Sequence, residues 1–215
     1  SASYTQSGGL FILRGRLQRI PVSYTTIGDI TDVSTSTLGL SRANNGINTA
    51  FGSFNLENTT NIYTVSGGTV RIYDVTLNTG NKAFDVKSSL SNTNVTGGSL
   101  EIYPVSGTAL PDAASYLVYS TAPVYDLKIN NFSSTSLTGL STPLTVLNDL
   151  NLISGGLSAN NNNLSVGGDF TIENGTTYTP GNNNTIFNGS GKQIFTINSG
   201  TALSLYALTL TKTAN

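Results

Sequence analysis

Short runs of alternating apolar and polar residues recur through the second half of the chain. The runs are three to five residues long and include LTVL, LNLI, DFTI, TIF, IFTI and LTL. Between them stand GG, NNNN, NG, PGNNN and NGSG. Alternation with a period of two is typical of a β-strand, and clusters of glycine and asparagine are typical of turns. The pattern therefore predicts many short strands and almost no helix.

The runs repeat with a nearly constant step. Aligned positions stand 21, 20, 21 and 21 residues apart, namely Tyr125, Val146, Val166, Phe187 and Leu208. Such a step, with two or three strands per unit, is typical of a solenoid, because stacked coils must match in length. A β-sandwich or meander is the alternative, but hairpins need no constant step. We therefore predict an all-β chain folded as a right-handed parallel β-helix of about ten coils, each of about 20 to 21 residues.

Inward-facing residues of successive coils are expected to stack about 4.8 Å apart, so that the rod is roughly 50 Å long. Two such apolar rows are predicted, two residues apart along each strand. The first row contains Leu127, Leu150, Phe170 and Leu208. The second row contains Ile129, Leu152, Ile172 and Leu210.

A Gly-Gly motif marks the first half of the chain. It reads SGGLFIL from Ser7, SGGTVRI from Ser66 and TGGSLEI from Thr96, with weaker copies around Gly155 and Gly167. Glycine permits a tight bend, and the alternating run after it predicts a strand. The motif aligns Phe11 and Leu13 with Val70 and Ile72, and these with Leu100 and Ile102.

The spacing of the motif is less regular than the step in the second half. We expect one β-helical segment over 1–215, with irregular coils over 1–105 and regular coils over 106–215. Longer loops are predicted around 28–50 and 79–95, where turn sequences stand at 43–46 and 78–81. Both ends break into the pattern without a polar cap, so we expect a longer parent chain.

The amino-acid composition excludes several kinds of catalytic and binding site. The chain has 215 residues, only 10% of them charged, a net charge of −1, and no His, Cys, Met or Trp. A Ser-His-Asp triad, a Cys-His pair and the usual zinc sites are therefore excluded. The sequence contains no stripe of basic residues, so a nucleic-acid partner is not expected. It also contains no run of 18 apolar residues, so no membrane span is expected. We expect no cofactor and no enzymatic activity.

Several motifs resemble the β-helical repeats of very large surface proteins of the Bacteroidota. They are SGGTVRIYDV, LSVGGDFTI, TIFNGSGKQIFTI and LYALTLTKT, and the similarity is strongest from Val124 to Thr213. These proteins include the SprB-type gliding adhesins and related filamentous cargo of the type 9 secretion system. The resemblance implies an extracellular, cell-surface location and a stalk or filament role in attachment or gliding motility. It implies no defined binding site.

Three acidic residues occupy the same place before a strand, Asp126, Asp149 and Asp169. Stacked one coil apart, their carboxylates would lie ~5 Å apart, which is near the spacing of a retaining glycosidase pair. They could instead share a structural Ca²⁺. The structural interpretation, which we favour, is that they are solvated turn residues or caps that accept a backbone N–H. The three glutamates, Glu57, Glu101 and Glu173, are far apart in sequence.

Other polar groups have a structural and a binding interpretation. Asparagines at 160–163 and 182–184 are expected to stack at one corner, where Asn tolerates left-handed backbone, and glycan binding is the alternative. A tyrosine group could stack on sugars but is more simply strand-filling. It contains Tyr63, Tyr73, Tyr103, Tyr116, Tyr119 and Tyr125. Arg14, Arg16 and Arg19 fit a solvated strand face better than an anion patch. Sequons at Asn58, Asn94, Asn131 and Asn174 are expected by chance.

Three functions are consistent with these patterns. The first is a structural or adhesive segment of a large secreted protein, with polysaccharide or surface ligands and adjoining segments of the same protein as partners. The second is a polysaccharide lyase or hydrolase of the β-helix type, which needs Asp126, Asp149 or Asp169 to converge with Arg or Lys on one face. The third is a secreted cargo segment held by its export machinery.

Overall fold

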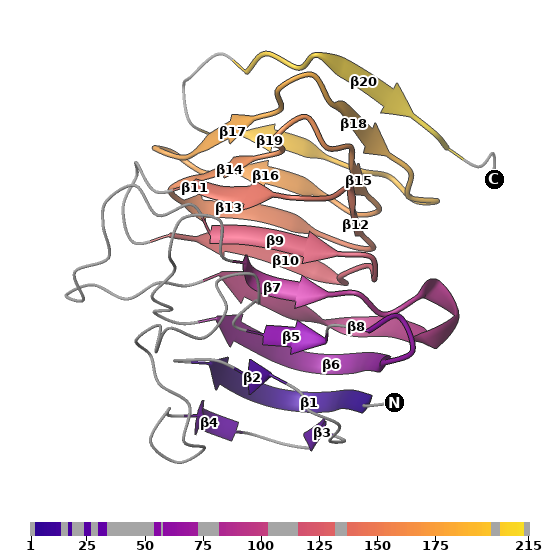
Figure 1. The fold of residues 1–215 in the computed structure, drawn as a ribbon. Helices are drawn as coiled ribbons and strands as arrows, with labels where there is room; N and C mark the ends of the chain where they lie inside the picture. The colour runs from indigo at the N-terminus through magenta and orange to yellow at the C-terminus, as the bar shows by residue number, and fades with distance from the viewer. Residues whose placement is uncertain are drawn as a thin grey trace.

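In the computed structural model the chain is built from three parallel β-sheets (Figure 1). The structure describes residues 3–13, 17–18, 24–26, 30–33, 54–56, 58–72, 82–102, 116–131, 137–198 and 203–212. Within these ranges every strand pairing is parallel. The same residues contain no α-helix and one 3-10 turn, η1 (Leu90–Asn92). The predicted all-β, parallel character is confirmed.

The strands of each sheet are stacked along one axis. Sheet A contains β3 (Tyr24–Thr26), β4 (Ile30–Val33), β1 (Ser3–Leu13), β6 (Ile62–Ile72), β8 (Thr93–Ile102), β10 (Asp126–Asn130), β13 (Leu150–Ser154), β16 (Phe170–Ile172) and β19 (Phe195–Ile197). Sheet B contains β2 (Leu17–Gln18), β5 (Phe54–Leu56), β7 (Lys82–Val86), β9 (Tyr116–Ser120), β11 (Leu137–Leu140), β14 (Gly156–Ser158) and β17 (Thr177–Thr179). Sheet C contains β12 (Leu144–Val146), β15 (Leu164–Val166), β18 (Asn184–Phe187) and β20 (Ala207–Leu210). From β10 to β19 the chain visits sheets A, B and C in turn.

The inward residues of sheet C confirm part of the predicted register. Val146 pairs with Val166, and Val166 pairs with Phe187. At the two ends the prediction was wrong, since Val124 rather than Tyr125 pairs with Val146, and Leu210 rather than Leu208 pairs with Phe187.

The two predicted apolar rows are correct over three layers and wrong in the fourth. Leu127, Leu150 and Phe170 stack in sheet A, as do Ile129, Leu152 and Ile172. The next members are Phe195 and Ile197, whereas Leu208 and Leu210 belong to sheet C. Three residues (167–169) connect β15 to β16, but seven (188–194) connect β18 to β19. These additional residues lengthen the spacing between equivalent positions in the sequence, but β19 still pairs with β16.

The Gly-Gly motif forms the bends of the long strands β1, β6 and β8. The predicted alignment is confirmed, because Phe11 pairs with Val70 and Val70 pairs with Leu100. In each motif the second glycine is left-handed, with φ of +74° at Gly9, +78° at Gly68 and +88° at Gly98. The glycines also permit close stacking, since a Cβ on Gly68 would lie 2.5 Å from backbone oxygens of β1.

The first half of the chain departs from the predicted arrangement. The loop expected around 79–95 contains β7 and the start of β8, so that prediction was wrong. The sequence KAFDV of β7 carries only one clear apolar–polar alternation, which is too little to predict a strand. In the range 28–50, β4 is a strand. Residues 34–50 lie outside the described residues, and so do the two turn sequences, 43–46 and 78–81. Strands β3 and β4 pair with the side of β1 opposite β6, so the stack does not follow sequence order here.

The connections that link sheet A to sheet B differ in length. Nine residues (73–81) link β6 to β7, thirteen (103–115) link β8 to β9, and one residue, Gly155, links β13 to β14. The core beside these connections remains continuous, and its aromatic rings stack between layers. The ring centroids of Phe54 and Phe84 are 5.2 Å apart, and those of Phe170 and Phe195 are 4.9 Å apart.

Replacing Gly68 by Ala should destabilise the chain more than replacing Gly175. Both glycines have nearly the same φ, +78° and +79°, so both changes carry the left-handed cost of about 1–2 kcal/mol. Only Gly68 adds a clash with neighbouring backbone, since nothing lies within 4 Å of a Cβ on Gly175. Urea denaturation of the two variants measures the difference, and equal losses would show that the close stacking of β1 and β6 is not a constraint.

Candidate functional site

The three aspartates form a ladder of backbone caps. The backbone N–H of Asp149 donates to Oδ1 of Asp126 at 3.2 Å, and that of Asp169 donates to Oδ1 of Asp149 at 2.8 Å. The N–H of Ile194 donates in the same way to Oδ1 of Asp169 at 2.8 Å. Each carboxylate thus holds the start of the strand in the next layer, as the structural interpretation predicted.

The caps engage one oxygen of each aspartate. Asn148 adds a second donor to Oδ1 of Asp126, at 2.8 Å. Across the ranges that the structure describes, no three His, Cys, Asp or Glu side chains come close enough to hold a metal ion. Oδ1 of each aspartate bonds to the next layer, which favours the structural interpretation of these residues.

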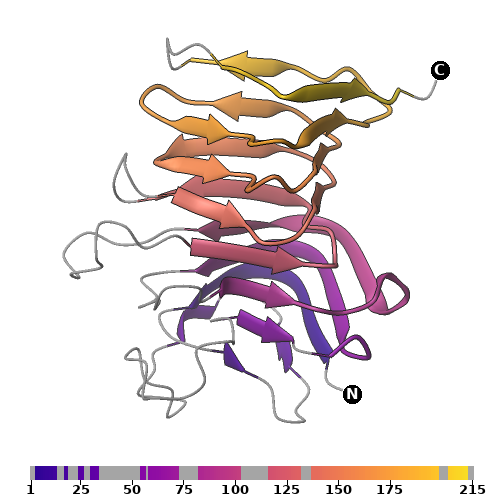
Figure 2. The ribbon, with the colours of Figure 1, turned by 45° about the horizontal axis from the view of Figure 1, so that its top comes forward.

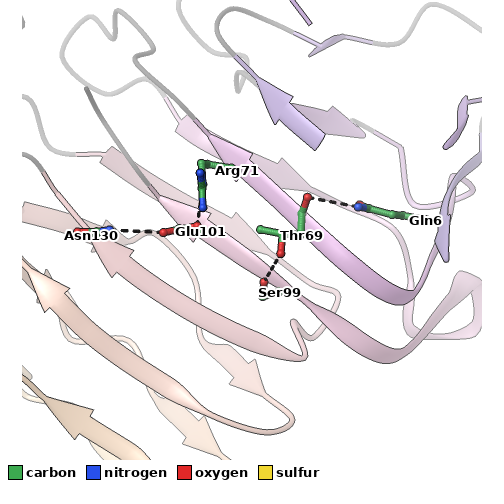
Figure 3. A network of polar contacts seen from close by, with 6 residues as sticks. All are labelled: Gln6, Thr69, Arg71, Ser99, Glu101 and Asn130. Carbon is green, nitrogen blue, oxygen red and sulfur yellow. Dashed lines mark hydrogen bonds and ion pairs between the residues drawn. The ribbon is translucent and has the colours of Figure 1, made fainter. Parts of the chain in front are cut away.

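Glu101 belongs to a polar network on sheet A (Figure 3). Its Oε2 accepts from Nε of Arg71 at 2.8 Å, and its Oε1 accepts from Nδ2 of Asn130 at 3.5 Å. In the neighbouring row the hydroxyls of Thr69 and Ser99 are 2.9 Å apart. The Glu101 carboxylate is buried and satisfied by residues of the adjoining layers. Of the other glutamates, Glu173 accepts from Asn198 at 3.1 Å, and Glu57 lies outside the described residues.

The asparagines stack at one corner, as predicted. Oδ1 of Asn161 accepts from the N–H of Asn182 at 2.7 Å, and Oδ1 of Asn163 accepts from that of Asn184 at 2.9 Å. Asn160 and Asn161 have φ of +50° and +65°, the left-handed conformation that Asn tolerates. These amides join the two layers, which favours the structural interpretation over glycan binding.

The tyrosines do not form one exposed platform. Tyr63 and Tyr116 are buried in the core, while Tyr119 and Tyr125 are partly exposed. Tyr73 and Tyr103 lie outside the described residues, as do Arg14, Arg16 and Arg19. Strand filling therefore explains the two buried rings.

The sequon positions differ in exposure. Asn58, Asn94 and Asn174 are exposed, whereas Asn131 is buried. Asn131 has a structural role, because its Nδ2 donates to the carbonyl of Gly156 at 3.3 Å and its Oδ1 accepts from the Thr138 hydroxyl at 3.2 Å.

One charged cluster was missed by the sequence analysis. Asp85 of β7 is fully buried, and its Oδ2 lies 3.2 Å from Nζ of Lys82 and 3.7 Å from Nζ of Lys87. The Lys82 ammonium also lies 4.5 Å from the centre of the Tyr119 ring. Among the residues that the structure describes, the Oδ1 of Asp85 has no hydrogen-bond partner. The signal was the KxxDxK spacing of KAFDVK, which places two cations beside one carboxylate and does not suit a metal ion.

A small pocket lies beneath the Gly97–Gly98 bend. Its lining includes Tyr63, Val70 and Val124 and contains no charged side chain.

Comparisons with known proteins add no assignment to this geometry. The chain matched no protein-family model, no curated protein and no solved structure. In the described part of the chain, no helix has the length and apolar character needed to cross a membrane.

Replacing Asp149 by Ala should lower the free energy of unfolding by about 1–2 kcal/mol, because the N–H of Asp169 loses its acceptor. Asp149→Asn keeps an oxygen at that position and should cost clearly less. Urea denaturation of both variants tests this difference. A cap role would be refuted if the Ala and Asn variants were equally stable.

The Tyr63 hydroxyl should make the fold sensitive to alkali. Burial, together with nearby Tyr4, raises the pKa of Tyr63 well above the ordinary value of about 10. The folded state therefore holds this proton more tightly than the unfolded state. Its contribution to stability is intact below pH ~10 and falls as the pH rises above that value. Tyr63→Phe should flatten the fall in unfolding free energy between pH ~10 and ~12.

The matched control for this prediction is Tyr206→Phe, because Tyr206 is exposed. That variant should follow the parent chain at every pH. A Tyr63→Phe variant with the same alkaline slope as the parent would contradict the prediction.

Proposed function

We propose that the chain is a structural and adhesive segment of a large secreted cell-surface protein, folded as a right-handed parallel β-helix. The observation that carries this proposal is that the repeated polar residues bond to neighbouring layers. Asp126, Asp149 and Asp169 cap the strands above them, and the asparagines of the corner do the same. These side chains therefore stiffen a stack rather than converge on a substrate.

A stalk requires a core that continues from layer to layer, and the three sheets supply one. In sheet A an inward row runs through Val70, Leu100, Leu127, Leu150 and Phe170 by direct pairing. These side chains are at most 3% exposed. Parallel stacking of this kind gives an elongated body that bears contacts along its length, which suits a spacer at a cell surface.

Adhesion would come from repetition rather than from one strong site. The outer rows of sheet A present polar side chains layer after layer, such as Lys128, Asn151 and Thr171, which pair in one row. Weak contacts of this kind to polysaccharide or another surface add up when several engage together. The resemblance to gliding adhesins supports a location outside the cell and a role in attachment or motility. No contact among the described residues favours an enzyme or an export cargo.

Fab fragments raised against the folded chain test this proposal on the cells that produce it. They should label intact cells and reduce attachment to polysaccharide-coated glass, whereas an unrelated Fab should do neither. Labelling that appears only after permeabilisation would overturn the surface assignment. Release of reducing ends from a polysaccharide by the purified chain, lost in Asp149→Asn, would overturn the structural one.

A further inference from the structure

Two of the three Asn-Gly pairs in the sequence lie among the described residues, and their surroundings differ. Asparagine amides are chemically labile, and a following glycine increases this lability because it has no side chain to hinder attack by its own backbone nitrogen. The described pairs are Asn174–Gly175, between β16 and β17, and Asn188–Gly189, directly after β18. Asn45–Gly46 lies outside the described residues. The same dipeptide therefore stands in two different environments.

The first pair forms an exposed turn with few contacts. The N–H of Thr176 donates to the carbonyl of Glu173 at 3.1 Å, so Asn174 and Gly175 are the two central residues of a β-turn. Both are exposed, and nothing lies within 4 Å of a Cβ placed on Gly175. Among the described residues no hydrogen bond holds the Asn174 amide or the Gly175 N–H. Figure 2 shows this turn, in orange, at the outer edge of the stack.

The second pair is held by the adjoining layer. The N–H of Asn188 donates to the carbonyl of Val166 at 3.1 Å, and the N–H of Gly189 donates to Oε1 of Gln193 at 3.0 Å. Gln193 is itself fixed, because its Nε2 donates to backbone carbonyls of that layer. A Cβ on Gly189 would clash with the carbonyl oxygen of Gly167, so the two backbones are closely packed. The Gly189 nitrogen is therefore not free to attack the Asn188 side chain.

We propose that Asn174 is a site of spontaneous deamidation and that the fold protects Asn188 from the same reaction. The backbone nitrogen of Gly175 loses its proton and forms a bond to Cγ of Asn174. The Cγ–Nδ2 bond of Asn174 breaks, and ammonia leaves with a proton from solvent. The resulting cyclic succinimide takes up one water and opens at either carbonyl, which gives aspartate or isoaspartate at this position. Water is the only co-reactant.

The product would alter the turn in charge and in length. Deamidation adds one negative charge beside Glu173, whose carbonyl also accepts from the Thr176 hydroxyl at 2.7 Å. Isoaspartate would add one carbon to a backbone segment whose two ends are joined by hydrogen bonds. The change falls on the connection between sheet A and sheet B rather than on the inward rows.

Peptide mapping of the purified chain by tandem mass spectrometry tests the proposal. In mildly alkaline buffer Asn174 should convert roughly tenfold faster than Asn188, or more, because reaction at Asn188 first requires local opening of its layer. In urea the fold is lost, so the rates at the two pairs should become similar. Equal rates in the folded chain, a rate ratio that urea leaves unchanged, or an Asn174 that converts only in urea would each overturn the proposal.

Two variants separate the reactive turn from the protected one. Asn174→Gln should abolish conversion at that position, because the longer side chain closes a ring far more slowly. Gln193→Ala removes the acceptor of the Gly189 N–H, so it should accelerate conversion at Asn188 and leave the rate at Asn174 unchanged. Circular dichroism should show that both variants are folded. A folded Gln193→Ala variant in which Asn188 reacts as slowly as in the parent would overturn the protection assigned to the adjoining layer.

Discussion

The hydrogen bonds between layers are the constraint on which the rest of the molecule depends. Because every described strand pairs in parallel with its equivalent in the next layer, an inward residue must face an inward residue. Leu127, Leu150, Phe170 and Phe195 are therefore a single column, although 23, 20 and 25 residues separate them. The same requirement explains the glycines at the bends, where backbone approaches backbone too closely for a side chain.

Alternation and a steady step in the sequence were sufficient to predict much of this arrangement. They identified the parallel all-β character, the pairing of Val146 with Val166 and of Val166 with Phe187, and the corner formed by the asparagines. They failed where the connection lengthens. The additional residues before β19 include Gln193, whose Nε2 donates to the carbonyls of Val166 and Gly168 at 2.8 and 2.6 Å. A count of residues along the sequence cannot distinguish such a connecting residue, which bonds to the neighbouring layer, from a residue of a strand.

The candidate site was predictable only in its position. The recurrence of Asp before a strand showed that Asp126, Asp149 and Asp169 would stack, but it left open whether they face a ligand or a backbone N–H. That choice depends on distances between layers, which the sequence does not contain. Asp85 shows the converse, because its two lysine neighbours are visible in KAFDVK, whereas its complete burial arises from the packing of the folded chain.

Because the connections at the corner between sheets A and B differ in length, the number of residues in the chain does not fix the length of the stack. A layer that carries a thirteen-residue connection and a layer joined through Gly155 alone advance the axis by the same increment, about 4.8 Å. Insertions at that corner can therefore lengthen the chain without changing the length of the stack along its axis. Only the gain or loss of a whole layer alters that distance, so it changes in fixed increments.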